Sequence, residues 1–194
     1  YIRTNLYLLK AKTWENDLYK SETNIEVKQI PESVNQTEIL TEIENLKTKS
    51  LLFQQGSMMV FFAEPADIQY VLNEIGRLRE ITFREVGEGT NMEIDTDKYD
   101  QYYKQLFVWD DDSKRIVGGY RVGMGADIME KYGKKGFYTY TLFKMSDKMD
   151  PILKETLELG RSFIVKDFQK GTTSLLLLWK GILQIFVSCN NYRY

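Results

Sequence analysis

The sequence predicts an α+β (mixed α/β) fold in which helices flank a central, mostly antiparallel sheet. Three observations support this prediction. Short apolar runs of strand length alternate with segments of helical period, and two of these runs are separated only by a polar turn typical of a hairpin. The last long apolar segment is apolar on nearly every side, which is typical of a buried helix.

The first half of the chain is expected to begin with a connecting segment and to continue as helix, strand and helix. Residues 1–35 mix aromatic and charged residues without a clear period, so we expect a linker or the tail of a preceding domain there. Apolar residues recur at helical spacing over 36–49, and an apolar, aromatic run over 57–63 suits a strand. A proline at position 65 suits the first turn of a helix that continues through Leu78.

The second half is expected to hold paired strands, a further strand and a long helix. Strands are expected over 105–109 and 115–122, because the short polar residues between them are typical of a hairpin turn. Residues 157–165 form another strand candidate, and a buried helix should follow over about 174–187. The final residues resemble a strand just beginning, so we expect one domain over 36–194 that is truncated at its C-terminus.

The composition excludes several classes of chemistry. The 194-residue chain contains no histidine, which rules out Ser-His-Asp and Cys-His mechanisms and histidine-ligated zinc, and no metal site is expected. Its net charge of −2 offers no broad basic field for nucleic acid. No Gly-x-Gly-x-x-Gly or Walker motif occurs, so nucleotide chemistry has no support.

Cysteine content and hydropathy predict a cytoplasmic protein. The single Cys189 cannot form an internal disulfide or a Cys-x-x-Cys metal site, which fits a reducing compartment. The longest apolar stretch, about 175–187, is interrupted by polar residues and is too short to span a bilayer. Nothing at the start of the chain reads as a signal peptide.

An acid and an arginine interrupt the apolar run at 157–165. Burying either Glu158 or Arg161 without a partner would be costly, and strict alternation along a strand would send them to opposite faces. Gly160 lies between them and is the residue type that permits a β-bulge, which would turn both toward one side. We predict a central strand distorted at Gly160, on which both side chains converge on one cavity or contact each other. A structural ion pair and a site role are equal alternatives at this point.

Two further groups of charges precede this strand. Asp97 and Asp100 lie in an acidic run after Arg79, and Arg121 ends another strand pattern. An acidic run in a loop is usually only solvated, which is the simpler interpretation. The alternative is a buried network, because buried charges separated in sequence persist only where they meet a partner. We predict that one of the two acids lies within ion-pair distance of Arg79, Arg121 or Arg161.

Four motifs follow one another along the chain: Arg79 with Phe83, Asp97-x-Tyr99-Asp100, Gly118-x-x-Arg121 and Glu158-x-x-Arg161. Their order and approximate spacing resemble the acyl-homoserine lactone synthases, GNAT-fold enzymes that take acyl chains from acyl carrier protein. The sequence is still more similar to the ornithine- and glycine-lipid N-acyltransferases, relatives that often carry a hemolysin label. That similarity covers roughly residues 55–194. It rests on Leu-Arg-Glu-Ile-Thr-Phe-Arg at 78–84, Phe-Tyr-Thr at 137–139, Glu-Leu-Gly-Arg-Ser at 158–162 and Leu-Leu-Leu-Trp-Lys-Gly at 176–181.

The resemblance implies a GNAT-like fold and an N-acyltransferase. Such an enzyme would move a (3-hydroxy)fatty acyl group from acyl carrier protein to the amino group of an amino acid, in the biosynthesis of ornithine or glycine lipids. No tightly bound cofactor is implied, only an acyl thioester donor. In some members of this family the domain follows a lysophospholipid acyltransferase domain in one polypeptide. We therefore expect residues 1–35 to be the linker to such a domain or its tail. Peripheral contact with the inner face of the membrane is a further expectation.

Two departures from the family patterns narrow the chemistry. The lactone synthases carry a tryptophan soon after the position of Phe83, whereas this chain has Gly-Glu-Gly at 87–89, which disfavours lactone synthesis. Acetyl-CoA users of the fold have a glycine-rich loop whose N–H groups hold the pyrophosphate. Residues 169–174 contain one glycine, so acyl-CoA is disfavoured as the donor and a carrier-protein thioester is favoured.

Within this resemblance the chemistry of acyl transfer assigns roles to the charged residues. Glu158 is the candidate base that takes a proton from the acceptor ammonium, and Arg161 would orient it or bind an anionic substrate group. Backbone N–H groups of Phe163, Ile164 and Val165, where a bulged strand leaves its neighbour, are candidates for the oxyanion site.

Substrate and carrier contacts complete the expected site. The substrate-binding candidates near the entrance are Arg79, Phe83, Asp97, Asp100 and Arg121. The candidates for docking an acidic carrier protein are Lys166, Lys170 and Lys180, whose simpler interpretation is surface solubility. An apolar slot for the acyl chain could draw on Phe137, Tyr138, Tyr140, Leu142 and Phe143, for which a place in the core is the simpler interpretation.

Two functions of other classes are the alternatives. One is a non-catalytic module that binds acyl carrier protein. The other is a membrane-active protein in keeping with the hemolysin label, although no convincing exposed amphipathic or membrane-spanning segment is found in the sequence.

Overall fold

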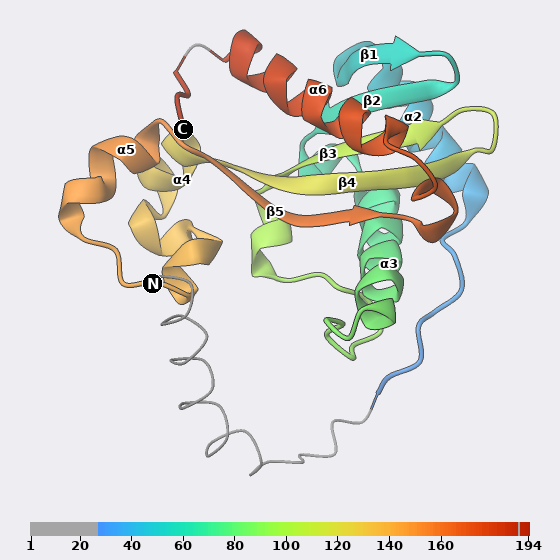
Figure 1. The fold of residues 1–194 in the computed structure, drawn as a ribbon, viewed down its shortest axis with the longest axis horizontal. Helices are drawn as coiled ribbons and strands as arrows, with labels where there is room; N and C mark the ends of the chain where they lie inside the picture. Colours follow the sequence, from blue (N-terminus) through green and yellow to red (C-terminus); the bar gives the residue numbers. More distant parts are fainter. Residues whose placement is uncertain (1–26, 190) are drawn as a thin grey trace, which may run out of the picture.

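The computed structural model describes residues 27–189 and 191–194. Five strands form one antiparallel sheet in which every strand pairs with its sequence neighbours, in the order β1-β2-β3-β4-β5 (Figure 1). The strands are β1 (Leu51–Gln55), β2 (Met58–Ala63), β3 (Lys104–Asp110), β4 (Arg115–Met124) and β5 (Leu157–Ile164). The predicted antiparallel sheet is confirmed, and so is the hairpin between β3 and β4.

Helices cover both faces of this sheet (Figure 1). Helices α2 (Gln36–Lys49) and α3 (Gln69–Glu85) pack on one face, and α6 (Thr173–Ser188) packs on the other. Two short helices, α4 (Gly125–Lys131) and α5 (Asp150–Lys154), lie in the connection from β4 to β5. Single 3₁₀ turns occur at Pro65–Asp67, Lys98–Gln101, Gly133–Gly136, Tyr138–Thr141, Asp147–Met149 and Lys166–Phe168.

The period-two alternation of the strands builds a core on each face of the sheet. On β3, Phe107 faces α2 and α3 while its neighbour Leu106 faces α6, and both are fully buried. Phe61 on β2 stacks on Phe107 with ring centroids 5.3 Å apart. A third, smaller cluster around Tyr103 and Phe137 lies beside α4 and α5. This third cluster packs the start of the segment at 137–143, which lies between β4 and β5 and lines the cavity described below.

Three expectations about the elements are corrected by the structure. The segment at 65–78 is a 3₁₀ turn followed by a helix that runs on to Glu85, because Ile68 leaves helical geometry between them. Strand β1 was not predicted. Strand β5 is the edge of the described sheet and not a central strand. Residues 191–194 lie beside its start, where the Leu157 N–H donates to the Tyr194 carbonyl at 2.9 Å.

Helix α6 was predicted to be buried all round, and this is wrong for its outer face. The sheet buries one side, on which Leu177, Leu178 and Ile185 are nearly inaccessible. Leu176 and Leu183 on the opposite side are more than half exposed. Uniform hydrophobicity removes the periodic signal that would have told the two faces apart. Most of the predicted linker, residues 1–26, lies outside the described residues.

Candidate active site

A bulge in β5 determines where its charged side chains point. Gly119 pairs with Phe163 and Arg121 pairs with Gly160, so Arg161 and Ser162 together oppose the single residue Tyr120 of β4. Arg161 has a left-handed φ of 49°. In a regular strand Arg161 would point to the face opposite Glu158, and the extra residue of the bulge turns it to the same face. The predicted distortion is confirmed, although it falls one residue later than Gly160, at Arg161 itself.

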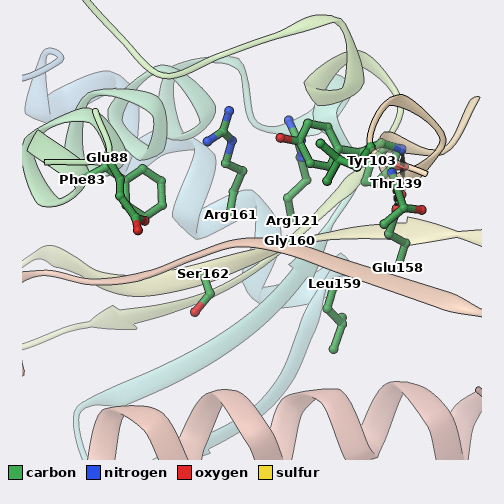
Figure 2. Close-up of a pocket in the computed structure, with 12 residues that line it drawn as sticks. Phe83, Glu88, Tyr103, Arg121, Thr139, Glu158, Leu159, Gly160, Arg161 and Ser162 are labelled. Carbon is green, nitrogen blue, oxygen red and sulfur yellow. Dashed lines mark hydrogen bonds between the residues drawn. The ribbon is translucent and has the colours of Figure 1, made fainter. Parts of the chain in front are cut away.

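This bulge opens onto a cavity of about 370 Å³. Figure 2 shows Glu158, Arg121 and Arg161 on one side of β5, whereas Leu159 and Ser162 point to the other side. The lining residues are Phe83, Glu88, Tyr103, Arg121, Tyr138, Thr139, Leu142, Glu158, Leu159, Gly160, Arg161 and Ser162. The predicted convergence of Glu158 and Arg161 on one cavity is therefore confirmed, and Phe83 and Arg121 join them.

Glu158 is 9% exposed and its carboxylate accepts three hydrogen bonds. Its Oε2 accepts the Tyr103 hydroxyl and the Tyr138 N–H, the latter at 3.0 Å. Its Oε1 accepts only the Thr139 N–H, at 2.8 Å. Each carboxylate oxygen can accept about two hydrogen bonds. Oε1 therefore keeps one acceptor position for a group in the cavity.

Tyr103 is the site residue that the sequence interpretation missed. It lies just before β3 and is 1% exposed, and its hydroxyl donates to Glu158. Burial, together with the hydrogen bond to Glu158, raises the pKa of the Tyr103 hydroxyl far above its ordinary value. The hydroxyl therefore stays a proton donor at neutral pH. Three tyrosines at positions 99, 102 and 103 are typical of a core cluster, and nothing in their spacing marks the third as a partner of Glu158.

Arg161 stands between the cavity and an acidic loop. Its Nη2 lies 3.5 Å from Oδ1 of Asp95, and no group among the described residues accepts a hydrogen bond from its buried Nε. The guanidinium also lies over the rings of Phe83 and Tyr138. Burial raises the pKa of Asp95, although the charges of Arg79 and Arg161 oppose this shift. The long ion pair leaves Arg161 with capacity for an anionic ligand.

Behind the cavity, a buried ionic network holds Arg121. Its Nη1 lies 2.7 Å from Asp97 Oδ1 and 3.2 Å from Asp100 Oδ2, and Arg79 reaches Asp100 at 3.0 Å. The two acids are brought together because the Asp97 side chain caps the 3₁₀ turn at 98–101 and Asp100 accepts the Asp97 N–H. The predicted network is confirmed. Arg79, Asp97 and Asp100 do not line this cavity, so they support Arg121 from behind.

The network also lowers the pKa of one carboxyl group, that of Asp97. Burial alone raises the pKa of Asp97, but the hydrogen bond from Arg121, its charge and the Tyr99 N–H outweigh this effect and hold the pKa below its ordinary value. Asp97 is therefore ionised at neutral pH, and its charge compensates that of Arg121 beside the cavity.

The proposed oxyanion donors are placed elsewhere than expected. The Val165 N–H donates to the Val117 carbonyl at 2.9 Å, Phe163 is buried in the core, and neither they nor Ile164 line the cavity. The strand separates two residues earlier, so that the bulge residues Arg161 and Ser162 lack partner residues on β4.

The three lysines expected to dock a carrier protein do not form one patch. Lys166 pairs with Glu85 at the end of α3 at 2.9 Å. Lys180 lies over the Phe53 ring on the face of the sheet covered by α6. Lys170 lies in the exposed loop before α6.

The aromatic segment at 137–143 contributes only part of the expected acyl slot. Tyr138 and Leu142 line the cavity, whereas Phe137 is buried in the core and Phe143 is exposed. Among residues 27–189 and 191–194 no cluster of three or more metal-binding side chains occurs. Within the same residues no helix is long and apolar enough to cross a bilayer.

Comparison with known proteins gives a family and two relatives. The model of the acetyltransferase (GNAT) domain matches residues 78–180. The chain is 35% identical over 166 residues to a glycine N(alpha)-acyltransferase of Bacteroides thetaiotaomicron, a match covering 80% of this chain and 48% of the relative. It is 39% identical over 139 residues to a glycine N(alpha)-acyltransferase of Phocaeicola vulgatus, covering 66% of this chain and 43% of the relative. The chain thus spans about half the length of these relatives. No solved structure matches.

Proposed function

The chain belongs to the acetyltransferase (GNAT) domain family, and from this premise we propose that it transfers a fatty acyl group from a thioester to the α-amino group of glycine or a similarly small amino acid. One observation carries the proposal. The bulged strand β5 presents to one cavity both a carboxylate with a vacant acceptor position and an arginine whose ion pair to Asp95 is long, at 3.5 Å. These two groups match the ammonium and the carboxylate of an amino acid.

The reaction requires one bond to form and one to break. The acceptor ammonium gives a proton to Glu158, directly or through water, and the neutral nitrogen then attacks the thioester carbonyl carbon. The C–S bond breaks as the amide forms, and the leaving thiolate takes up the second proton of the nitrogen. Tyr103 positions Glu158 by donating to Oε2, which leaves Oε1 for the substrate.

Arg161 would bind the acceptor carboxylate in place of its long contact with Asp95. A charged hydrogen bond to a carboxylate is stronger than a neutral one, and Arg161, whose side chain is 25% exposed, can offer its terminal guanidinium N–H groups to it. N–H groups at the bulge, at Arg161 and Ser162, are the proposed donors to the tetrahedral oxyanion. The names of the two relatives support glycine as the acceptor, and the product would be an aminolipid or its precursor.

The donor is proposed to be an acyl thioester of a phosphopantetheine group, on acyl carrier protein and less favourably on coenzyme A. Helix α6 begins without a side-chain cap, so N–H groups of its first turn are available to a phosphate. The loop before it has one glycine, Gly171, with a φ of 124°. Carrier docking at a single lysine patch loses support, because Lys166 and Lys180 contact different faces of the sheet.

The proposal is tested by measuring thiol release from acyl carrier protein and acyl-CoA thioesters with the full-length protein. Release should require glycine or another small amino acid. Glu158→Gln should remove most turnover, since an amide cannot accept the proton, whereas Glu155→Gln removes an exposed carboxylate near the start of β5 and should keep activity. Thiol release that does not depend on any amine would contradict the proposal.

Two further variants separate binding from proton transfer. Arg161→Met should raise the KM for glycine about tenfold or more while the KM for the thioester stays unchanged, because only the acceptor carries the carboxylate. Tyr103→Phe should lower kcat while both KM values stay nearly unchanged, because Glu158 loses the hydroxyl that positions its carboxylate. An Arg161→Met enzyme with unchanged KM for glycine would remove Arg161 from the acceptor site.

A further inference from the structure

The outer face of α6 carries a continuous apolar row. Leu176, Trp179, Leu183 and Val187 are 57%, 53%, 64% and 78% exposed. Their spacing of three and four residues places them along one side of the helix. The opposite side of α6 packs on β2 and β3 and closes the core. Figure 1 shows α6 at the surface of the described fold, with no element over its outer side.

A row of this kind is not explained by the stability of the domain. Large apolar side chains are often exposed singly, but a contiguous exposed row usually marks an interaction surface. A tryptophan near the middle of the row is typical of a contact with a membrane interface, where its ring is apolar and its N–H reaches polar groups.

The charged residues of the segment that contains α6 indicate which kind of surface the apolar row binds. All 28 acidic residues of the chain lie before Gln169, and the remaining 26 residues carry only the basic side chains Lys170, Lys180 and Arg193. Lys180 is exposed and lies next to Trp179. An apolar helix face whose only charge is positive complements anionic lipid headgroups.

Two residues that line the cavity lie on the side of β5 that faces α6. Leu159 and Ser162 line the cavity but point to the side on which α6 lies (Figure 2). Leu159 is 40% exposed.

We propose that the outer face of α6 binds an anionic lipid surface, with Leu176, Trp179, Leu183 and Val187 inserted at the boundary between headgroups and acyl chains. A second copy of the chain fits this face less well, because a two-fold contact through α6 would bring the two Lys180 side chains toward each other. Lipid binding goes beyond the proposed acyl transfer and is measured without thioester or amino acid, so either proposal can fail while the other stands.

The test is cosedimentation of the full-length protein with vesicles of phosphatidylcholine, with or without phosphatidylglycerol. Binding should be stronger to the anionic vesicles and should fall with salt. The double variant Leu176→Ser/Leu183→Ser should lower the partition coefficient at least about tenfold, because each leucine contributes apolar area to the contact. Lys180→Glu should weaken binding to anionic vesicles alone. Ile152→Ser changes an exposed apolar residue on α5 and should have no effect.

A second measurement excludes other occupants of the row. Fluorescence of Trp179, assigned by comparison with Trp179→Phe, should be quenched by acrylamide in the free protein and protected by anionic vesicles. Protection of Trp179 before vesicles are added would mean that another part of the protein covers the row, and would overturn the proposal. So would a dimer that the double variant dissociates, or equal vesicle binding by the double variant and the unmodified protein.

Discussion

Replacing Asp100 by asparagine tests the buried network most directly. The Asp100 side chain is 4% exposed and accepts hydrogen bonds from Arg79, Arg121, Gln105 and the Asp97 N–H. Asparagine keeps the shape but removes the charge. It also turns an NH₂ group toward one of these donors.

The expected loss of stability depends on which partners Arg79 keeps once the charge of Asp100 is removed. Its guanidinium is 1% exposed, and among the described residues it keeps, besides Asp100, a hydrogen bond to the backbone carbonyl of Asp95 and the weaker attraction of the Asp95 carboxyl group. Breaking a buried ion pair from one side costs about 3–5 kcal/mol, because the other charge stays buried without compensation. Arg121 keeps Asp97, so the cost should arise mainly at Arg79. A loss of this size is a large fraction of the stability of a domain, about 5–15 kcal/mol.

Urea denaturation followed by circular dichroism measures this loss as a lower midpoint at unchanged slope. Asp167→Asn is the matched control. Asp167 pairs with Arg115 at 2.9 Å, but both side chains are about half exposed or more, so at most about 1 kcal/mol should be lost. Adding Arg79→Met to Asp100→Asn should restore part of the stability, since the uncompensated charge is then gone. Equal midpoints for Asp100→Asn and Asp167→Asn would refute the reasoning.

Two further predictions concern acid stability and the strand contact beside the bulge. Above about pH 4 the ionised Asp97 stabilises the fold through Arg121, and this contribution is lost as the pH falls through its lowered pKa, so Asp97→Asn should flatten the decrease in unfolding free energy below pH 4. An unchanged acid slope in this variant would contradict the assignment. Gly118→Ala should lower the melting temperature, because its Cβ would lie 2.4 Å from the Phe163 carbonyl oxygen, a cost of about 1–3 kcal/mol. Gly160→Ala, whose Cβ would meet nothing within 4 Å, should melt like the unmodified protein.

Much of the fold could be predicted because its strands are apolar runs bounded by polar turns. Strand β1 was missed because its five residues follow α2 directly and end in two polar glutamines. The charged network could be predicted because a buried charge needs a partner of opposite charge, even one that lies more than twenty residues away in the sequence. Tyr103 could not, since a tyrosine that supports Glu158 and a tyrosine that only fills the core have the same sequence pattern.

The order of the strands has a consequence for how the protein forms. Each strand pairs with its neighbour in sequence, and two of the four pairings, β1 with β2 and β3 with β4, close short loops and lose little chain entropy. The connection from β4 to β5 is long, because residues 125–156 lie between these strands, and among the described strands β5 is the last to be synthesised. Arg121 can meet Asp97 and Asp100 before β5 is present, whereas Glu158 and Arg161 arrive with it. We therefore expect a growing chain to hold strands β1 to β4 together before β5 docks, and the cavity to form only when β5 joins them.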